Sequence, residues 1–169
     1  MNIHTGEIQL VPYRETYRET YKEIIQSFTL PSEQVQFTSD PGELLKKAKS
    51  DRTKNVIVIL DYNGVPVGLF ALQTGERVQE FTENEDALLL TSFSVNYNKQ
   101  RKGYVKKAWA LLQDFAKHYF PIKNEVVLAV NEKNMPAQKL YEKVGFQDKG
   151  FRRMGPIGQQ IIMHLPIIK

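Results

Sequence analysis

The sequence predicts an α/β (α+β) fold, in which short apolar strands alternate with amphipathic helices. Residues 56–60 and 65–72 form apolar runs of strand length, and Asn63-Gly64 between them suits a tight hairpin turn. Apolar residues between 13 and 28, and again between 108 and 119, recur at helical spacing. Strand and helix patterns that alternate in this way favour a mixed sheet covered by helices.

Seven segments are predicted as strands, and the longest candidate is 87–95. The seven are 7–11, 56–60, 65–72, 87–95, 126–130, 147–154 and 159–165. The last two surround the turn 155–158, which contains two glycines and a proline. The segment 75–86 between the third and fourth strands is polar and is predicted as a loop.

Four helices are predicted, and several of their ends are set by local chemistry. The aromatic stripe of the first helix, which includes Tyr13, Tyr17 and Tyr21, is expected to pack on the core. Asp40-Pro41 has the form of a helix start, and Pro121 ends the helical pattern that passes through 108–119. The last helix, 134–144, has an asparagine cap at its start and a left-handed glycine, Gly145, at its end.

Composition predicts one globular domain over residues 1–169. The chain is 41% hydrophobic and 25% charged, and its net charge of +4 indicates a local basic patch rather than a polycation. It has no cysteine, and its three histidines lack metal-ligand spacing, so we expect no metal site. No apolar run approaches a membrane span, and residues 1–12 lack the apolar core of a signal peptide, which predicts a cytoplasmic protein.

The segment Gln100-Arg101-Lys102-Gly103-Tyr104-Val105 lies between the longest strand and a helix. A glycine-containing turn at a helix N-terminus offers backbone N–H groups and a positive dipole end to an anion. Five cations surround it and add positive charge that we expect to be mobile: Lys99, Arg101, Lys102, Lys106 and Lys107. We therefore expect an anionic cofactor at this turn.

A second pattern, Asn-x-x-Asn-x-x-Ala-x-x-x-Tyr-x-x-x-Gly-Phe, covers residues 131–146. This pattern and the turn together closely resemble the motifs of the GNAT superfamily of acyl-CoA-dependent N-acetyltransferases. The resemblance implies a mixed, mostly antiparallel seven-stranded sheet with helices on both faces. Its two central strands, here 88–95 and 126–130, would be parallel and splayed. Acetyl-CoA would enter the gap between them, with no metal required.

The resemblance also implies the residues that contact the cofactor. Its pantetheine arm would lie along Phe93, Ser94 and Val95, and its pyrophosphate would bind the turn from Gln100 through Arg101, Lys102, Gly103, Tyr104 and Val105 to Lys106. Asn131, Asn134 and Ala137 complete the expected cofactor contacts. Val105 departs from the family pattern, which has glycine or alanine there, although backbone groups could still hold the anion.

Tyr141 is the predicted catalytic residue. It follows Ala137 by one helical turn, so the small alanine leaves room for the pantetheine while the phenol reaches the sulfur. The implied mechanism is direct attack by a neutral amine on the thioester, with Tyr141 protonating the departing thiolate. The alternative is a core tyrosine whose hydroxyl meets water.

Other roles stay open at this stage. Asn134 is a helix cap, a cofactor contact or both, and by the resemblance Asn131 would mark the end of the splayed strand. The strand 88–95 carries Thr91, Ser92 and Ser94 but no carboxylate, so the general base is unassigned. The acidic loop 75–86 either is solvated or attracts a cationic amine.

These observations favour an N-acetyltransferase that transfers an acetyl group from acetyl-CoA to a primary amine of a small molecule or peptide. Its partners would be those two substrates, without nucleic acid or membrane, and the protein would be a monomer or homodimer. One alternative is a non-catalytic acyl-CoA-binding regulatory module of the same fold. Another is a nucleic-acid-binding module built on the basic segment 99–107, which only Tyr104 supports as an aromatic platform.

Overall fold

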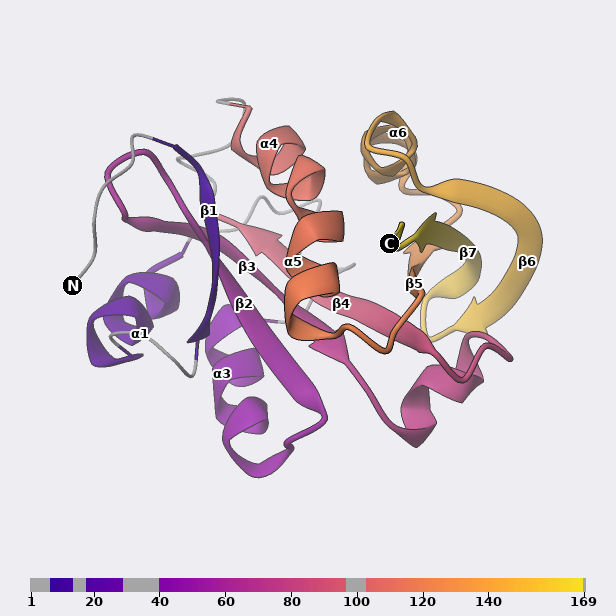
Figure 1. Cartoon of the computed structure of the whole chain (residues 1–169), viewed down its shortest axis with the longest axis horizontal. Helices are drawn as coiled ribbons and strands as arrows, with labels where there is room; N and C mark the ends of the chain where they lie inside the picture. The colour runs from indigo at the N-terminus through magenta and orange to yellow at the C-terminus, as the bar shows by residue number, and fades with distance from the viewer. Residues whose placement is uncertain (1–6, 14–17, 29–39, 97–102, 169) are drawn as a thin grey trace. The chain divides into compact units, whose positions relative to one another are not determined.

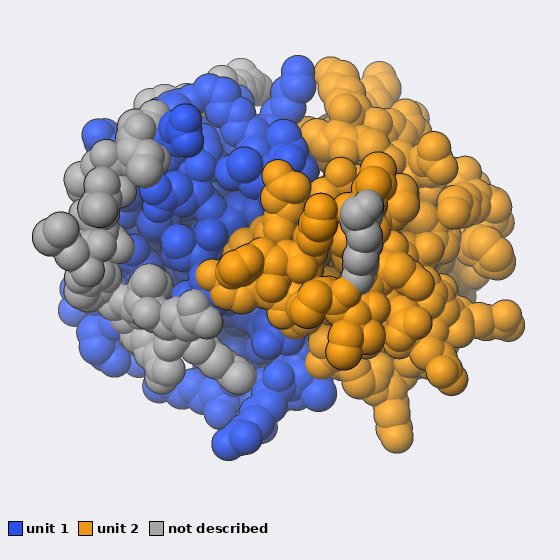
Figure 2. Space-filling model, in the orientation of Figure 1, with its two compact units in different colours: residues 1–72, 92–111 blue, residues 73–91, 112–169 orange. Residues whose placement is uncertain are grey.

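A computed structural model describes residues 7–13, 18–28, 40–96 and 103–168 of the chain. These residues fall into two compact units, coloured separately in Figure 2. Unit 1 comprises residues 1–72 and 92–111, and unit 2 comprises 73–91 and 112–169. Each unit has a core of its own and is described by itself.

Seven strands form one mixed sheet in the order β1-β2-β3-β4-β5-β7-β6 (Figure 1). β4 and β5 are parallel, whereas β1 with β2, β5 with β7 and β6 with β7 are antiparallel. The expected seven-stranded, mostly antiparallel sheet with two parallel central strands is thereby confirmed. The strands are β1 (Gln9–Pro12), β2 (Lys54–Leu60), β3 (Pro66–Gln73), β4 (Ala87–Val95), β5 (Glu125–Asn131), β6 (Gln147–Gly155) and β7 (Gly158–Pro166).

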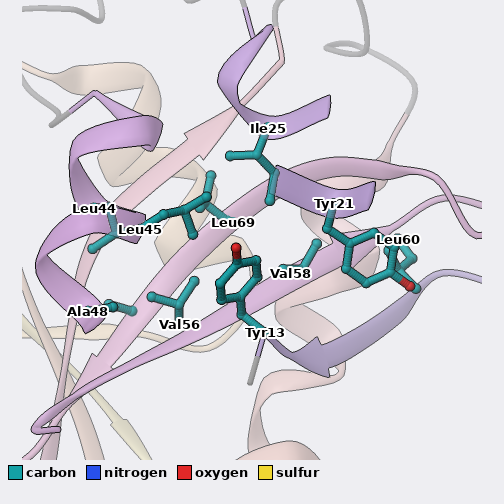
Figure 3. Close-up of a cluster of buried hydrophobic side chains, with 11 residues drawn as sticks. Tyr13, Tyr21, Ile25, Leu44, Leu45, Ala48, Val56, Val58, Leu60 and Leu69 are labelled. Atoms are coloured by element: carbon teal, nitrogen blue, oxygen red, sulfur yellow. The ribbon is translucent and has the colours of Figure 1, made fainter. Parts of the chain in front are cut away.

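Unit 1 has helices on both faces of its strands. α1 (Arg18–Gln26) and α3 (Pro41–Ser50) cover one face, where Tyr21 and Ile25 join alternate residues of β2 and β3 in a buried cluster (Figure 3). On the other face, Phe70 of β3 contacts Trp109 of α4 (Tyr104–Ala110), with 4.9 Å between the ring centroids. The aromatic stripe of the first helix is thus part of the core, as predicted for the tyrosines that are described.

Local chemistry sets the helix start and the hairpin of unit 1. The Asp40 carboxylate accepts a hydrogen bond of 3.1 Å from the backbone N–H of Glu43, and Pro41 opens α3. Gly64 has a φ of 75° in the turn between β2 and β3, where Asp61 and Val65 are joined by a backbone hydrogen bond of 2.9 Å. Both predicted features are confirmed.

Unit 2 is built around β5, β7 and β6. β5 pairs with β7 along its whole length, from Glu125↔Pro166 to Asn131↔Gln160. One face carries a small core in which Val127 and Ile162 contact Val78 of the loop that precedes β4. α5 (Leu112–Tyr119) and α6 (Met135–Lys143) complete the unit.

Three features depart from the predicted elements. The helical pattern predicted through 108–119 is divided between α4 and α5, because the N–H of Leu111 bonds to the carbonyls of Ala108 and Trp109 in a tightened turn. The loop 75–86 contains a short 3-10 helix, Glu76–Glu80. The pairing of β6 with β7 shifts between Asp148 and Arg152, so β6 carries an irregularity that alternation alone did not indicate.

Candidate functional site

The predicted cofactor residues of unit 1 lie at the end of β4 and the start of α4. Phe93 is half-buried and packs on Trp109 with 4.8 Å between ring centroids, while Ser94 and Val95 are buried. The backbone of β4 runs close to β3 here, since a Cβ built on Gly68 would lie 2.9 Å from the Ser94 carbonyl oxygen. β4 therefore has little room to shift toward β3.

The pairing of β4 with β5 stops well before either strand ends. Its last Cα partners are Leu90 and Leu128, although β4 continues to Val95 and β5 to Asn131. Two residues after that last pair, Ser92 has a φ of 58°, an uncommon left-handed conformation for a residue with a side chain. The parallel pairing therefore covers only the first part of β4. In the sequence, the signal of this backbone irregularity at Ser92 was the polar pair Thr91-Ser92 within an otherwise apolar run.

The start of α4 is formed by a left-handed glycine. Gly103 is the N-cap residue with a φ of 75°, no described side chain caps the helix, and a Cβ at this position would meet no described atom within 4 Å. Tyr104 is buried, Val105 is half-buried and Lys106 is exposed. Gln100, Arg101 and Lys102 lie outside the described residues.

Lys107, one of the five cations expected to be mobile, contacts an aromatic side chain of the β2–β3 hairpin. Its ammonium group donates a hydrogen bond to the Tyr62 hydroxyl and lies 4.8 Å from the centroid of that ring. Tyr62 in turn packs at 6.0 Å from Tyr104, the first residue of α4. The β2–β3 hairpin thus holds Lys107, a contact between distant segments that no local pattern indicated.

Unit 2 contains the two predicted asparagines. Asn131 is buried, and its side chain accepts a hydrogen bond of 2.9 Å from the Lys133 N–H and donates one of 3.2 Å to the Ile157 carbonyl. Asn134 is the N-cap of α6, and its side chain accepts a hydrogen bond of 3.3 Å from the Ala137 N–H. The capping role of Asn134 is confirmed, and a cofactor contact by either asparagine remains a prediction.

Ala137 and Tyr141 lie four residues apart on α6, so they share one side of the helix. Tyr141 is 8% exposed, and burial raises the pKa of its phenol well above the usual value. Its ring makes an edge contact with Phe146, 5.6 Å between centroids. Gly145, with a φ of 108°, ends the helix as predicted, and the Phe146 N–H returns to the Tyr141 carbonyl at 3.0 Å.

Gln138 lies on α6 among the predicted site residues, and the sequence analysis did not single it out. Its side-chain amide donates to the carbonyl oxygens of Asn131, at 3.1 Å, and Glu132, at 2.9 Å. It therefore joins α6 to the end of β5. The only available signal was its place within the motif, three residues before Tyr141.

The acidic loop is partly neutralised by arginines. Glu80 lies 4.0 Å from Arg77 and 3.9 Å from Arg153, and the Arg153 guanidinium lies 4.2 Å from the centroid of the Phe81 ring. The other four carboxylates of this segment are exposed: Glu76, Glu83, Glu85 and Asp86. These four side chains retain a negative field.

Two further searches were limited to the residues that the structure describes. Among them, no group of three or more potential ligands could hold a metal ion. His164 instead pairs with Glu125 at 2.9 Å. In the same part of the chain, no helix is long and apolar enough to cross a membrane.

The predicted site residues are therefore divided between the units. Phe93 to Val95 and Gly103 to Lys106 belong to unit 1, whereas Asn131, Asn134, Ala137 and Tyr141 belong to unit 2. Within unit 2, hydrogen bonds bring the end of β5 and the start of α6 together.

Comparison with known proteins supports the family that the sequence motifs indicate. Residues 15–146 match the Acetyltransferase (GNAT) family. An uncharacterised N-acetyltransferase of Bacillus subtilis (strain 168), YbbJ, is 45% identical over 141 residues, which cover 83% of this chain and 88% of that protein.

Solved structures agree with the fold. AAC(6')-Ib in complex with ribostamycin and coenzyme A superposes with a TM-score of 0.74 at 16% identity, over 95% of this chain and 93% of that one. Spermidine N-acetyltransferase from Vibrio cholerae, in complex with CoA and spermine, gives a TM-score of 0.62 at 17% identity and covers 96% of each chain. The seven-stranded sheet, its parallel central pair and the match over most of the chain show that this protein belongs to the GNAT family of acetyltransferases.

Proposed function

We propose that this chain transfers an acetyl group from acetyl-CoA directly to a primary amine of a small molecule or peptide. The observation that carries the proposal is the placement of Tyr141 on α6, on the same side of the helix as Ala137. A phenol carries its proton at neutral pH, and burial, which raises the pKa of Tyr141, reinforces this. Tyr141 would give that proton to the departing thiolate of CoA.

The start of α4 fits the anionic part of the cofactor. Asn134 caps α6 with its own side chain, whereas α4 begins at a glycine and has no cap from a described side chain. Backbone N–H groups that no described side chain caps, at a glycine whose Cβ would meet no described atom within 4 Å, suit a phosphate oxygen. Gly103 to Val105 would hold the pyrophosphate through the backbone, and Lys106 would add charge.

The proposed acceptor is defined by its reacting group, a primary amine. The exposed carboxylates of the loop 75–86 favour an amine that carries additional positive charge. The names of two proteins of similar fold fit this class: the Vibrio cholerae protein is a spermidine N-acetyltransferase, and AAC(6')-Ib was solved with ribostamycin. A polyamine, an aminoglycoside, an amino acid and a peptide N-terminus are all acceptors to test.

The test of the reaction is a thiol-release assay with acetyl-CoA and that panel of amines. Wild type is compared with Tyr141→Phe and with Tyr119→Phe, a control that removes a phenol from α5. We expect Tyr141→Phe to lower kcat by about 100-fold with CoA affinity within about twofold, as general acids typically contribute this much. Tyr119→Phe should retain the wild-type rate.

Two outcomes would contradict the proposal. Wild-type turnover by Tyr141→Phe would remove this residue from the chemistry. Binding of CoA without thiol release for any amine would instead support the non-catalytic acyl-CoA-binding alternative.

A matched pair of lysine variants tests the cofactor end. Lys106→Ala and Lys107→Ala remove the same charge from adjacent positions, but only Lys107 is held by Tyr62. We expect Lys106→Ala to weaken CoA binding by about two- to fivefold at low salt, and less at high salt because ions screen the interaction. Calorimetric titration measures both, and a larger effect of Lys107→Ala would argue against this placement of the phosphates.

A further inference from the structure

Gln138 occupies an unusual position in α6, because its side chain bonds to the strand that precedes the helix. The amide nitrogen donates to the Asn131 carbonyl at 3.1 Å and to the Glu132 carbonyl at 2.9 Å. A carboxamide nitrogen carries two protons, so it can serve two acceptors at once. The Asn131 carbonyl belongs to the last residue of β5 and the Glu132 carbonyl to the bend that follows, where backbone groups need partners outside the sheet.

The same bend is tied down from two other directions. The Asn134 N–H donates to the Asn131 carbonyl at 2.9 Å, so this oxygen accepts from both the backbone and Gln138. The Asn131 side chain donates to Ile157 in the turn between β6 and β7, and the Glu132 N–H donates to the Gln159 carbonyl at 3.0 Å. Gln138 therefore fixes α6 to a point that is itself fixed to the β6–β7 turn.

α6 needs such anchors. It has nine residues, and a helix of that length is marginal in water without contacts at its ends and along its buried side. Its C-terminal end is held by the return of the Phe146 N–H to the Tyr141 carbonyl and by the contact between these two rings. At the N-terminal end the Asn134 cap acts within the helix, whereas Gln138 links the helix to β5.

Gln138 and Tyr141 are three residues apart, which places them as neighbours on the helix surface. A shift of the first turn of α6 is thus transmitted to the phenol within one turn. Catalytic groups lose much of their effect when they are displaced by about 1 Å. The anchor at Gln138 consequently bears on the position of Tyr141 as well as on the stability of the helix.

We propose that Gln138 is a positioning residue for Tyr141: its amide ties the first turn of α6 to the carbonyls of Asn131 and Glu132 and thereby fixes where the phenol is presented. The inference rests on the proposed function, since it assigns Gln138 a part in the reaction attributed to Tyr141. Gln138 touches neither substrate nor reacting atoms in this role.

A double-mutant cycle tests the inference. Gln138→Met keeps the length of the side chain but removes both N–H donors, and it is made in the wild type and in Tyr141→Phe. We expect Gln138→Met alone to lower kcat about tenfold with KM for acetyl-CoA within twofold, and to have no further effect on kcat when Tyr141 is already phenylalanine. Lys139→Met, at the exposed neighbouring position of α6, is the control and should leave kcat unchanged.

Rescue by a second variant separates the donor from the bulk of the side chain. Gln138→Glu has the same shape, but its carboxylate would face two carbonyl oxygens and can donate only when protonated. Its kcat relative to wild type should therefore rise as the pH is lowered, while that of Gln138→Met stays low. A flat ratio for both variants would contradict the role assigned to the N–H groups.

A spectroscopic readout keeps the inference testable apart from the reaction. In protein labelled with 3-fluorotyrosine, the Tyr141 signal is identified by its loss in Tyr141→Phe, and we expect Gln138→Met to shift or broaden it while Lys139→Met does not. An unchanged signal, or a loss of kcat of equal size in both backgrounds of the cycle, overturns the inference. Wild-type turnover by Tyr141→Phe would instead count against the proposed function, and the fluorine signal would then still decide whether Gln138 positions this ring.

Discussion

Gly68→Ala should destabilise unit 1 because the added methyl group has no room between β3 and β4. A Cβ at this position would lie 2.9 Å from the Ser94 carbonyl oxygen, 3.1 Å from the Ile59 Cδ1 atom and 3.4 Å from the Val95 Cγ2 atom. Two of these are side-chain atoms that can move by rotation, but the Ser94 oxygen belongs to the backbone of β4. The strands must therefore separate by a few tenths of an ångström.

The size of the effect follows from this overlap. Inserting one methyl group into a packed interior costs about 1–3 kcal/mol, and contact with backbone places Gly68→Ala near 2 kcal/mol. For a chain of this length, that loss lowers Tm by roughly 4–8 °C. Gly150→Ala is the control, because its φ of 95° causes strain of about 1 kcal/mol while a Cβ there would meet no described atom within 4 Å.

Thermal unfolding followed by circular dichroism or calorimetry measures both variants. Gly68→Ala should lose more stability than Gly150→Ala, by about 2–4 °C in Tm. If Gly68→Ala were as stable as the wild type, the close approach of β3 to β4 at Ser94 would be wrong. An equal loss in the two variants would mean that backbone freedom, rather than the steric contact, explains Gly68.

Three further predictions concern α6 and β6. Asn134→Ala should cost about 1 kcal/mol of stability through loss of the cap, and CoA titration of the same variant will show whether Asn134 also contacts the cofactor. Hydrogen bonds from Arg152 and the Gly150 N–H lower the pKa of Asp148. The ionised Asp148 carboxylate therefore stabilises the fold fully above about pH 4, and this stabilisation is lost as the pH falls below that value. The Tm difference between wild type and Asp148→Asn should shrink from about pH 6 to about pH 3. Because burial raises the pKa of Tyr141, the folded state keeps a proton that the unfolded state loses above about pH 10. Above that pH, wild-type stability should fall more steeply than the stability of Tyr141→Phe. Denaturant titrations at about pH 9 and about pH 11 measure this difference.

Elements whose ends depend on nearby residues were predictable from the sequence. Asp40 and Asn134 each bond to an N–H three residues later, and Gly64 and Gly145 adopt the positive φ expected of them. The interactions that decide these features lie within a few residues of each other. Local chemistry was therefore sufficient.

Features that depend on distant segments were not predictable in the same way. The hydrogen bond between Lys107 and Tyr62 joins residues 45 positions apart, and basic residues beside a glycine give no indication of it. Ser92 adopts a left-handed backbone two residues after the last pair of β4 with β5, and serine has no particular preference for that conformation. Contacts between distant segments depend on how the strands are arranged in the folded sheet, and a pattern of strands along the sequence does not give that arrangement.

The motif that placed the chain in its family is largely a description of how α6 is built. Asn131 ties the helix approach to the β6–β7 turn, Asn134 caps the helix, and Gly145 and Phe146 end it beside Tyr141. Each of these residues has a structural partner in the protein itself, so the motif specifies where a phenol is held and says little about the amine. These residues therefore indicate the family but do not specify the acceptor. The exposed carboxylates of the acidic loop 75–86 make acceptor charge the first property to vary in the amine panel.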